Sequence, residues 1–167
     1  MTPSVSPDYL ADAVSMFRTY QGLGEKAIAQ VDDRAFFATA DAEANSIAII
    51  VKHVAGNQRS RWTDFLTTDG EKPDRDRDGE FVISAGTTRE EVMGWWREGW
   101  ALLYRTLESL GPEDLARNVT IRGKDHAVMQ AIQRQLTHYA YHVGQIVLLA
   151  RAAVGPGWET LSVPRKK

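Results

Sequence analysis

The chain of 167 residues contains no cysteine. This absence excludes disulfide bonds, thiolate nucleophiles and zinc sites built on cysteine thiolates. Any tight metal site must therefore be built from imidazole, carboxylate and water. Because the chain contains only four histidines, their positions decide where an imidazole site could form.

Long apolar runs and an excess of positive charge are missing too. No apolar stretch reaches the roughly 20 residues that a membrane-spanning helix needs, and the N-terminus lacks the basic-then-apolar order of a signal peptide. The formal net charge of −2 argues against a nucleic-acid partner, which usually selects a strongly basic face. We therefore expect a cytoplasmic protein with neither a nucleic-acid nor a membrane partner.

The composition is that of a soluble globular protein, with 43% apolar and 25% charged residues. The length fits one domain over residues 1–167, and no internal repeat is visible. Four segments show the apolar periodicity of helices. They span about residues 7–31, 42 or 45 to 66, 87 or 88 to 110, and 124 or 125 to 153. The sequence thus predicts an all-α four-helix bundle with a long crossover, residues 67–86, between the second and third helices.

Residues at the helix ends support these boundaries. Ser6 is expected to cap the first helix, with Pro7 at its first position. The run 87–91 offers two overlapping capping boxes for the third helix, which Gly111 and Pro112 should end. Phe36 and Phe37 are expected to close one end of the bundle. Two β-prone runs, residues 81–83 and 119–121, are predicted to pair as a small ribbon.

His138 and His142 are four residues apart on the predicted fourth helix, and this spacing places both on one face. Two such imidazoles need only a third ligand from a facing helix to hold a metal ion, and His53 on the second helix is the candidate. Spacing alone leaves open the alternative that these are hydrogen-bonded core histidines. His126, at the predicted start of the fourth helix, is expected to be a surface or capping residue.

Three polar residues accompany the histidines. Arg134 and Gln145 share the face of His138 and His142, and Asn57 lies one turn after His53. Polar groups that converge inside a bundle are costly unless they are paired, so they favour a pocket. The alternative is that they line the exit of the bundle to solvent.

These residues resemble the DinB/YfiT-like superfamily. The resemblance rests on His-Tyr-Ala-Tyr-His-Val-Gly-Gln-Ile-Val at 138–147, on an upstream His53 followed by Asn57, and on the segments 60–65 and 70–81. It implies an up-down-down-up bundle, often a homodimer, in which His53, His138 and His142 bind zinc or nickel, with iron or manganese as alternatives. Relatives include transferases and isomerases that use low-molecular-weight thiols such as bacillithiol or mycothiol, where the metal ion lowers the pKa of the thiol.

We therefore expect a divalent-metal-binding protein, a metal-dependent transferase or hydrolase that acts on a small molecule with a low-molecular-weight thiol as a candidate partner. No carboxylate occupies an obvious general-base position, which leaves Tyr139 or Tyr141 to exchange protons. The alternative is a non-catalytic, stress-associated dimer with a structural metal site, in which the metal links two helices.

The acidic run 74–79 is a rival metal site. Its alternate aspartates and its glycine match the opening of a calcium-binding EF-hand loop. The pattern then fails, because Ala85 stands where a bidentate glutamate is needed. Arg75 and Arg77 are instead expected to pair with these aspartates or with the bundle surface.

In the third helix, Trp95, Trp96 and Trp100 cannot all face one way, so either one faces a groove or a partner, or they pack beneath the crossover.

Overall fold

The structure, a computed structural model, describes residues 8–163 and is mostly helical. Its five α-helices are α1 (Asp8–Ile28), α2 (Asp33–Phe37), α3 (Ile47–Trp62), α4 (Arg89–Glu108) and α5 (Val128–Val154). A two-stranded sheet, β1 (Asn118–Ile121) and β2 (Lys124–Ala127), precedes α5. Three short 3₁₀ helices are η1 (Gly79–Phe81), η2 (Pro112–Ala116) and η3 (Gly155–Gly157). The expected cap at Ser6 and Pro7 lies outside the described residues. No described helix is long and apolar enough to cross a membrane.

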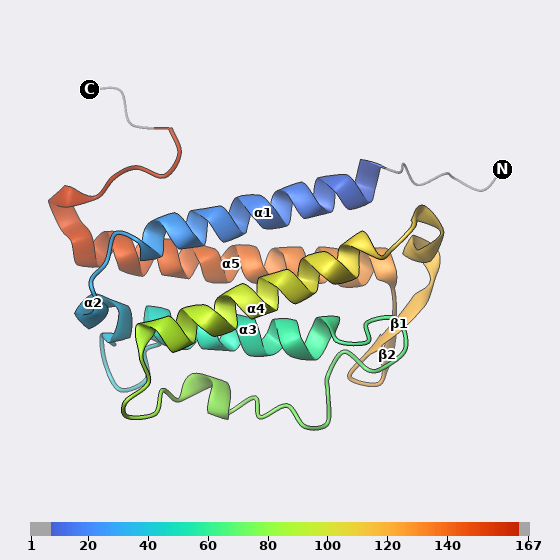
Figure 1. The fold of residues 1–167 in the computed structure, drawn as a ribbon, viewed down its shortest axis with the longest axis horizontal. Coiled ribbons are helices and arrows are strands. Elements are labelled where there is room, and N and C mark those ends of the chain that lie inside the picture. Colours follow the sequence, from blue (N-terminus) through green and yellow to red (C-terminus); the bar gives the residue numbers. More distant parts are fainter. Residues whose placement is uncertain (1–7, 164–167) are drawn as a thin grey trace.

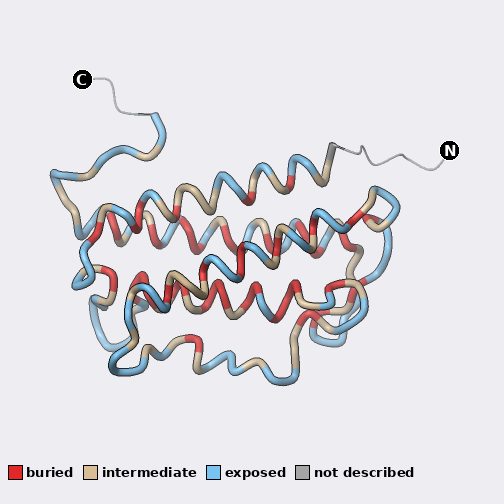
Figure 2. Tube along the Cα trace, viewed as in Figure 1, coloured by how far each residue is buried: buried red, intermediate tan, exposed pale blue. Residues whose placement is uncertain are grey.

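The four long helices form a helical bundle in which α1 packs along α5 and α3 packs along α4 (Figure 1). Each of them contributes one aromatic ring to the centre of the core. Phe17 of α1 lies 6.2 Å from Trp62 of α3, 6.2 Å from Trp100 of α4 and 5.9 Å from Tyr139 of α5, measured between ring centroids. All four side chains are at most 1% exposed. The buried positions of the helices face this shared interior (Figure 2), and aromatic side chains of this size dominate the burial of apolar surface.

Capping residues set where two of the helices begin. The hydroxyl of Ser46 accepts a hydrogen bond from the backbone N–H of Ile49 and so starts α3. Of the two overlapping boxes predicted for α4, the second forms: Thr88 caps the helix, and the side chain of Glu91 accepts a bond from the backbone N–H of Thr88. α3 is shorter than predicted, because its C-cap Thr63 is extended and Asp64 adopts a positive φ of 48°.

The predicted pairing of residues 81–83 with 119–121 is wrong. Residues 79–81 form η1, whereas β1 pairs antiparallel with β2, so that Val119 lies opposite His126. The turn between the strands is Arg122-Gly123, with φ of 54° and 69°. This two-residue turn costs less loop-closure entropy than the long loop that pairing residues 81–83 with 119–121 would have to close. As a consequence, α5 begins at Val128 rather than at 124 or 125, and His126 lies on a strand rather than at a helix start.

The crossover between α3 and α4 is fixed to the rest of the molecule by hydrogen bonds. Near its start, Ser60 of α3 donates to the carbonyl of Gly70, and the N–H of Gly70 donates to the carbonyl of Thr120 in β1. Further along, Lys52 of α3 donates to the carbonyls of Gly79 and Val82 at 2.8 and 2.6 Å. These bonds hold η1 against the flank of α3, beside the histidines.

Candidate metal centre

The three predicted histidines lie together between α3 and α5. The Nε2 atom of His138 is 3.4 Å from Nε2 of His53 and 3.0 Å from Nε2 of His142. One ring nitrogen from each residue lies within 4.8 Å of the other two, so the group could hold a metal ion. Among the side chains that the structure describes, those of residues 9–163, no other group of at least three histidines, aspartates or glutamates has such an arrangement. The acidic run 74–79 therefore does not form a comparable site, and Asp76 instead accepts the backbone N–H of Gly79.

In His53 and His142, a hydrogen bond at Nδ1, the ring nitrogen that faces away from the shared point, orients the ring. Nδ1 of His53 lies 2.8 Å from Oε2 of Glu80, and Nδ1 of His142 lies 2.8 Å from Oε1 of Gln145. A neutral imidazole that donates from Nδ1 presents a lone pair at Nε2. In this tautomer, each of the two rings directs its Nε2 lone pair at the shared point. Carboxylates and amides commonly orient metal-binding histidines in this way.

Glu80 is the functional residue that sequence reasoning missed. Its side chain is buried, and Nε and Nη2 of Arg75 donate to its two oxygens at 2.7 and 2.8 Å. Burial by itself would raise the pKa of Glu80, but the hydrogen bonds from His53 and Arg75 outweigh burial and hold this pKa below its usual value. Glu80 is therefore ionised at neutral pH. The signal for it in the sequence is its place in the segment 70–81 that carries the family resemblance, directly before Phe81, whose ring stacks on His53 at 4.8 Å in the structure.

Arg75 pairs with glutamates rather than with the neighbouring aspartates. Its Nη1 lies 3.2 Å from both carboxylate oxygens of Glu71, in addition to the two bonds to Glu80. Arg77 makes no ion pair and no side-chain hydrogen bond with any described residue. The expected pairing with the aspartates is therefore wrong for Arg75, since the chain turns at η1 and brings Glu80 to its guanidinium.

The donor set fits a divalent metal ion. Burial, together with the neighbouring imidazoles, lowers the pKa of His138 to about 3, and burial followed by the proximity of His53 lowers the pKa of His142 to about 4. Both rings are therefore neutral at pH 7. When Nδ1 of His53 and Nδ1 of His142 donate outward, the Nε2 atoms of these two rings carry lone pairs and no proton. Only His138 can then carry a proton on Nε2, and this proton can bond to just one of the two facing lone pairs. A cation at the shared point would instead bind the Nε2 lone pairs of all three histidines.

A cavity of about 560 Å³ opens beside the three histidines. The three residues predicted to form a pocket all line it: Asn57, Arg134 and Gln145. Tyr141 also lines it, and its ring lies 4.0 Å from that of His142. Tyr139 does not: it is fully buried, its hydroxyl accepts from Trp62 and donates to Asn57, and burial raises its pKa. Of the two tyrosines considered for proton exchange, Tyr141 alone is placed at the cavity.

A family model described as a protein of unknown function, DUF1572, matches residues 4–167. The chain belongs to this family. No curated protein and no solved structure matches the chain. The DUF1572 family carries no assigned activity in its description, so the function of this chain has to be argued from its own residues.

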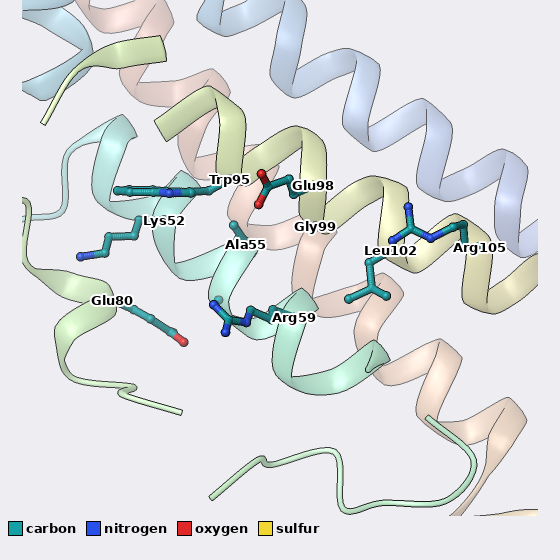
Figure 3. A pocket seen from close by; sticks show the side chains of 10 residues that line it. Lys52, Ala55, Arg59, Glu80, Trp95, Glu98, Gly99, Leu102 and Arg105 are labelled. Atoms are coloured by element: carbon teal, nitrogen blue, oxygen red, sulfur yellow. The ribbon is translucent and has the colours of Figure 1, made fainter. Parts of the chain in front are cut away.

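A second cavity of about 450 Å³ lies between α3 and α4, and Glu80 of the crossover also lines it (Figure 3). Trp95 lines it, with Lys52 5.7 Å from the centre of the indole ring, whereas Trp96 and Trp100 are buried in the core. One of the three clustered tryptophans thus faces a groove, as one of the two readings predicted. Cationic and acidic side chains are mixed along this groove. Glu80 lines this groove and also bonds to His53 of the histidine site.

Proposed function

We propose that the protein is a divalent-metal-dependent enzyme, a transferase or hydrolase that acts on a small molecule. The observation that carries this proposal is the convergence of three imidazole nitrogens, from His53, His138 and His142, at the wall of an open polar cavity. Among the described side chains, no aspartate or glutamate joins the group as a fourth ligand. Metal sites with three protein ligands and an open position are typical of catalysis, whereas structural sites are closed by a fourth protein ligand.

The fold supports the finer assignment to the DinB/YfiT-like superfamily. In Figure 1, α1 and α5 run in one direction and α3 and α4 run in the other. This arrangement agrees with the up-down-down-up order that the resemblance implies. The single long crossover then connects the two parallel helices α3 and α4, and it brings Glu80 to His53.

Each residue of the site has a separate task. The three histidines hold the ion, Glu80 and Gln145 fix the rings of His53 and His142, and the cavity admits the substrate. When bound, a divalent ion such as zinc or nickel, or alternatively iron or manganese, would act as a Lewis acid that lowers the pKa of a nucleophile, either water or a small thiol. No carboxylate of the described residues lines the cavity, so we assign proton exchange with the substrate to the hydroxyl of Tyr141, a lining residue.

Metal content tests the first part of the proposal. Protein purified in metal-free buffers and then loaded should retain one equivalent of zinc or nickel by elemental analysis. Excess metal should raise the melting temperature, because a ligand that binds only the folded state stabilises it. His142→Ala should lose both effects, whereas His126→Ala, on the β2 strand, should keep both. A wild-type protein without stoichiometric metal would overturn the proposal.

Cobalt substitution separates a catalytic site from a structural one. The visible absorption bands of Co²⁺ report its coordination, so azide or 2-mercaptoethanol should change the spectrum when an open position exists. The alternative, a stress-associated dimer in which the metal only links α3 to α5, predicts a closed site and an unchanged spectrum. Sedimentation with and without metal tests the proposed homodimer in the same samples.

A further inference from the structure

Arginines dominate the wall of the cavity beside the histidines. They come from α3, the crossover, the β-turn and α5, and they are Arg61, Arg75, Arg77, Arg122 and Arg134. No aspartate or glutamate in the described part of the chain lines this cavity, although the chain as a whole has 22 acidic and 20 basic residues. The concentration of guanidinium groups is therefore a property of the cavity and not of the composition.

Two carboxylates outside the lining neutralise part of this charge. Glu80 accepts two hydrogen bonds from Arg75 and one from His53. Glu71 is shared, because its carboxylate lies 3.2 Å from Arg75, 3.2 Å from Arg122 and 3.8 Å from Arg61. Five guanidinium groups thus face two carboxylates, which leaves a net excess of about three positive charges around the cavity.

Arg77 and Arg134 carry two of these charges. Neither side chain makes an ion pair or a hydrogen bond with any of residues 9–163. Both are exposed, Arg77 on the crossover and Arg134 on α5, one turn before His138. They are therefore free to bind a ligand at the opening of the cavity without giving up an existing partner.

Arg61 lies deeper and is only 3% exposed. Its Nε and Nη1 atoms are buried and have no hydrogen-bond partner among the described residues. Burial lowers the pKa of Arg61, since a charged group loses its hydration in the interior. Gly70 packs against it so closely that a Cβ atom there would lie 2.5 Å from Nη1. Because the protein encloses Nε and Nη1, the nitrogen of Arg61 left to donate to a ligand in the cavity is Nη2, which lies 3.8 Å from Oε2 of Glu71. An oxyanion bound there would lower the cost of burying this cation.

We propose that the substrate of this cavity is a small organic oxyanion, whose carboxylate or phosphate group is bound by Arg61, Arg77 and Arg134. Guanidinium groups bind both kinds of anion through paired N–H donors. The acidic group anchors the molecule on the arginine side, and its reacting atom then lies toward the three histidines. This inference rests on the proposed function, because it places the anion as the substrate of the metal centre.

Calorimetric titration with matched probes tests the proposal. Succinate and succinamide have the same carbon chain, but only succinate is charged, and inorganic phosphate tests the other kind of anion. Succinate or phosphate should bind at least about tenfold more tightly than succinamide, and the affinity should fall as salt is added. If neither anion binds better than succinamide, the proposal is wrong. Whichever anion binds more tightly identifies the acidic group.

Arginine variants locate the binding. Arg77→Gln and Arg134→Gln should each weaken binding of the preferred anion by about tenfold. Arg151→Gln is the matched control, because Arg151 is exposed on the same helix as Arg134 but does not line the cavity. An equal loss in Arg151→Gln would mean that the anion responds only to the overall charge, and this would overturn the assignment.

The titrations are repeated on metal-free wild-type protein and on His142→Ala, so that the two proposals can fail separately. If the protein retains no metal but still binds the anion, the oxyanion site is supported and the proposed metal-dependent function is wrong. If the protein retains stoichiometric metal but binds succinate and phosphate no better than succinamide, the metal centre is supported and the oxyanion site is wrong. Both results are read from the same purified samples.

Discussion

Oε2 of Glu80 accepts a hydrogen bond from Nδ1 of His53 at 2.8 Å, across 27 positions of sequence. Glu80 belongs to η1 in the crossover, whereas His53 is on α3. Arg75 holds the same carboxylate with two further hydrogen bonds. The crossover is therefore part of the candidate metal centre, since the path of this segment decides how the ring of His53 is oriented.

Glu80→Gln should weaken metal binding. The amide accepts a weaker bond from His53 than the carboxylate does, and it leaves the buried guanidinium of Arg75 without this ion pair. We expect the affinity for zinc to fall by about 10–100-fold, the usual effect of losing a group that orients a metal-binding histidine. Competition with a chromophoric chelator measures this change.

Two further variants separate orientation from buried charge. Glu98→Gln alters an exposed carboxylate that does not contact the histidines and should bind zinc like the wild type. The double variant Arg75→Gln/Glu80→Gln removes both buried charges, so it should regain melting temperature relative to Glu80→Gln but should not regain affinity. Equal zinc affinity in Glu80→Gln and Glu98→Gln would show that the carboxylate does not orient His53.

The sequence predicts one part of the site well, because that part is local. His138 and His142 share a face of α5 by helical spacing alone. His53 joins them only through the packing of α3 against α5, which no spacing rule provides and which the family resemblance supplied. Glu80 depends on a crossover path that is fixed by side-chain bonds to backbone carbonyls, such as those from Lys52. No local pattern specifies such a path.

The helices and the strands show the same contrast. Periodicity and the capping box at Thr88 predict the helices because these signals act within one turn. The hairpin was paired wrongly because its turn, Arg122-Gly123, has an arginine at a positive-φ position where asparagine, aspartate or glycine is usual. Its conformation is supported from elsewhere, since the carboxylate of Asp69 accepts the backbone N–H groups of both turn residues at 2.8 Å.

Asp69→Ala should loosen this hairpin. Both turn N–H groups would lose their acceptor, and we expect the free energy of unfolding to fall by about 1 kcal/mol, because water can replace part of the interaction at this exposed site. Hydrogen exchange of the Arg122 and Gly123 amides should become faster. Asp12→Ala, an exposed position on α1, serves as the control. Unchanged exchange at the two amides would contradict the role given to Asp69.

Tyr139→Phe should destabilise the core without removing the metal. The hydroxyl accepts a bond from Trp62 Nε1 at 3.1 Å and donates to Asn57 Oδ1 at 3.0 Å, so its loss leaves two buried polar groups unpaired. The expected loss is about 1–3 kcal/mol in chemical denaturation. Tyr20→Phe is the matched control, because Tyr20 is half-buried and its hydroxyl bonds to no described residue. Loss of metal content in Tyr139→Phe would instead give this hydroxyl a direct part in the site.

The stability of the metal-free protein should depend on pH through the histidines. The folded protein holds His138 and His142 neutral, with pKa values of about 3 and about 4, chiefly because the rings are buried. In the unfolded chain both pKa values return to about 6.5. The unfolded state therefore binds more protons between pH 6.5 and 4. The free energy of unfolding must fall as the pH is lowered through this window, and it should change little on this account above about pH 7.

Urea denaturation of the chelator-treated protein at a series of pH values measures this dependence. Near pH 5 the slope should approach about two protons per molecule from these two residues, in addition to smaller contributions from carboxylates at lower pH. The double variant His138→Asn/His142→Asn should flatten the curve between pH 6.5 and 5, whereas His126→Ala should leave it as steep as in the wild type. A curve that keeps its full slope in the double variant would place the titrating groups elsewhere, and the histidines would then not be held neutral by burial.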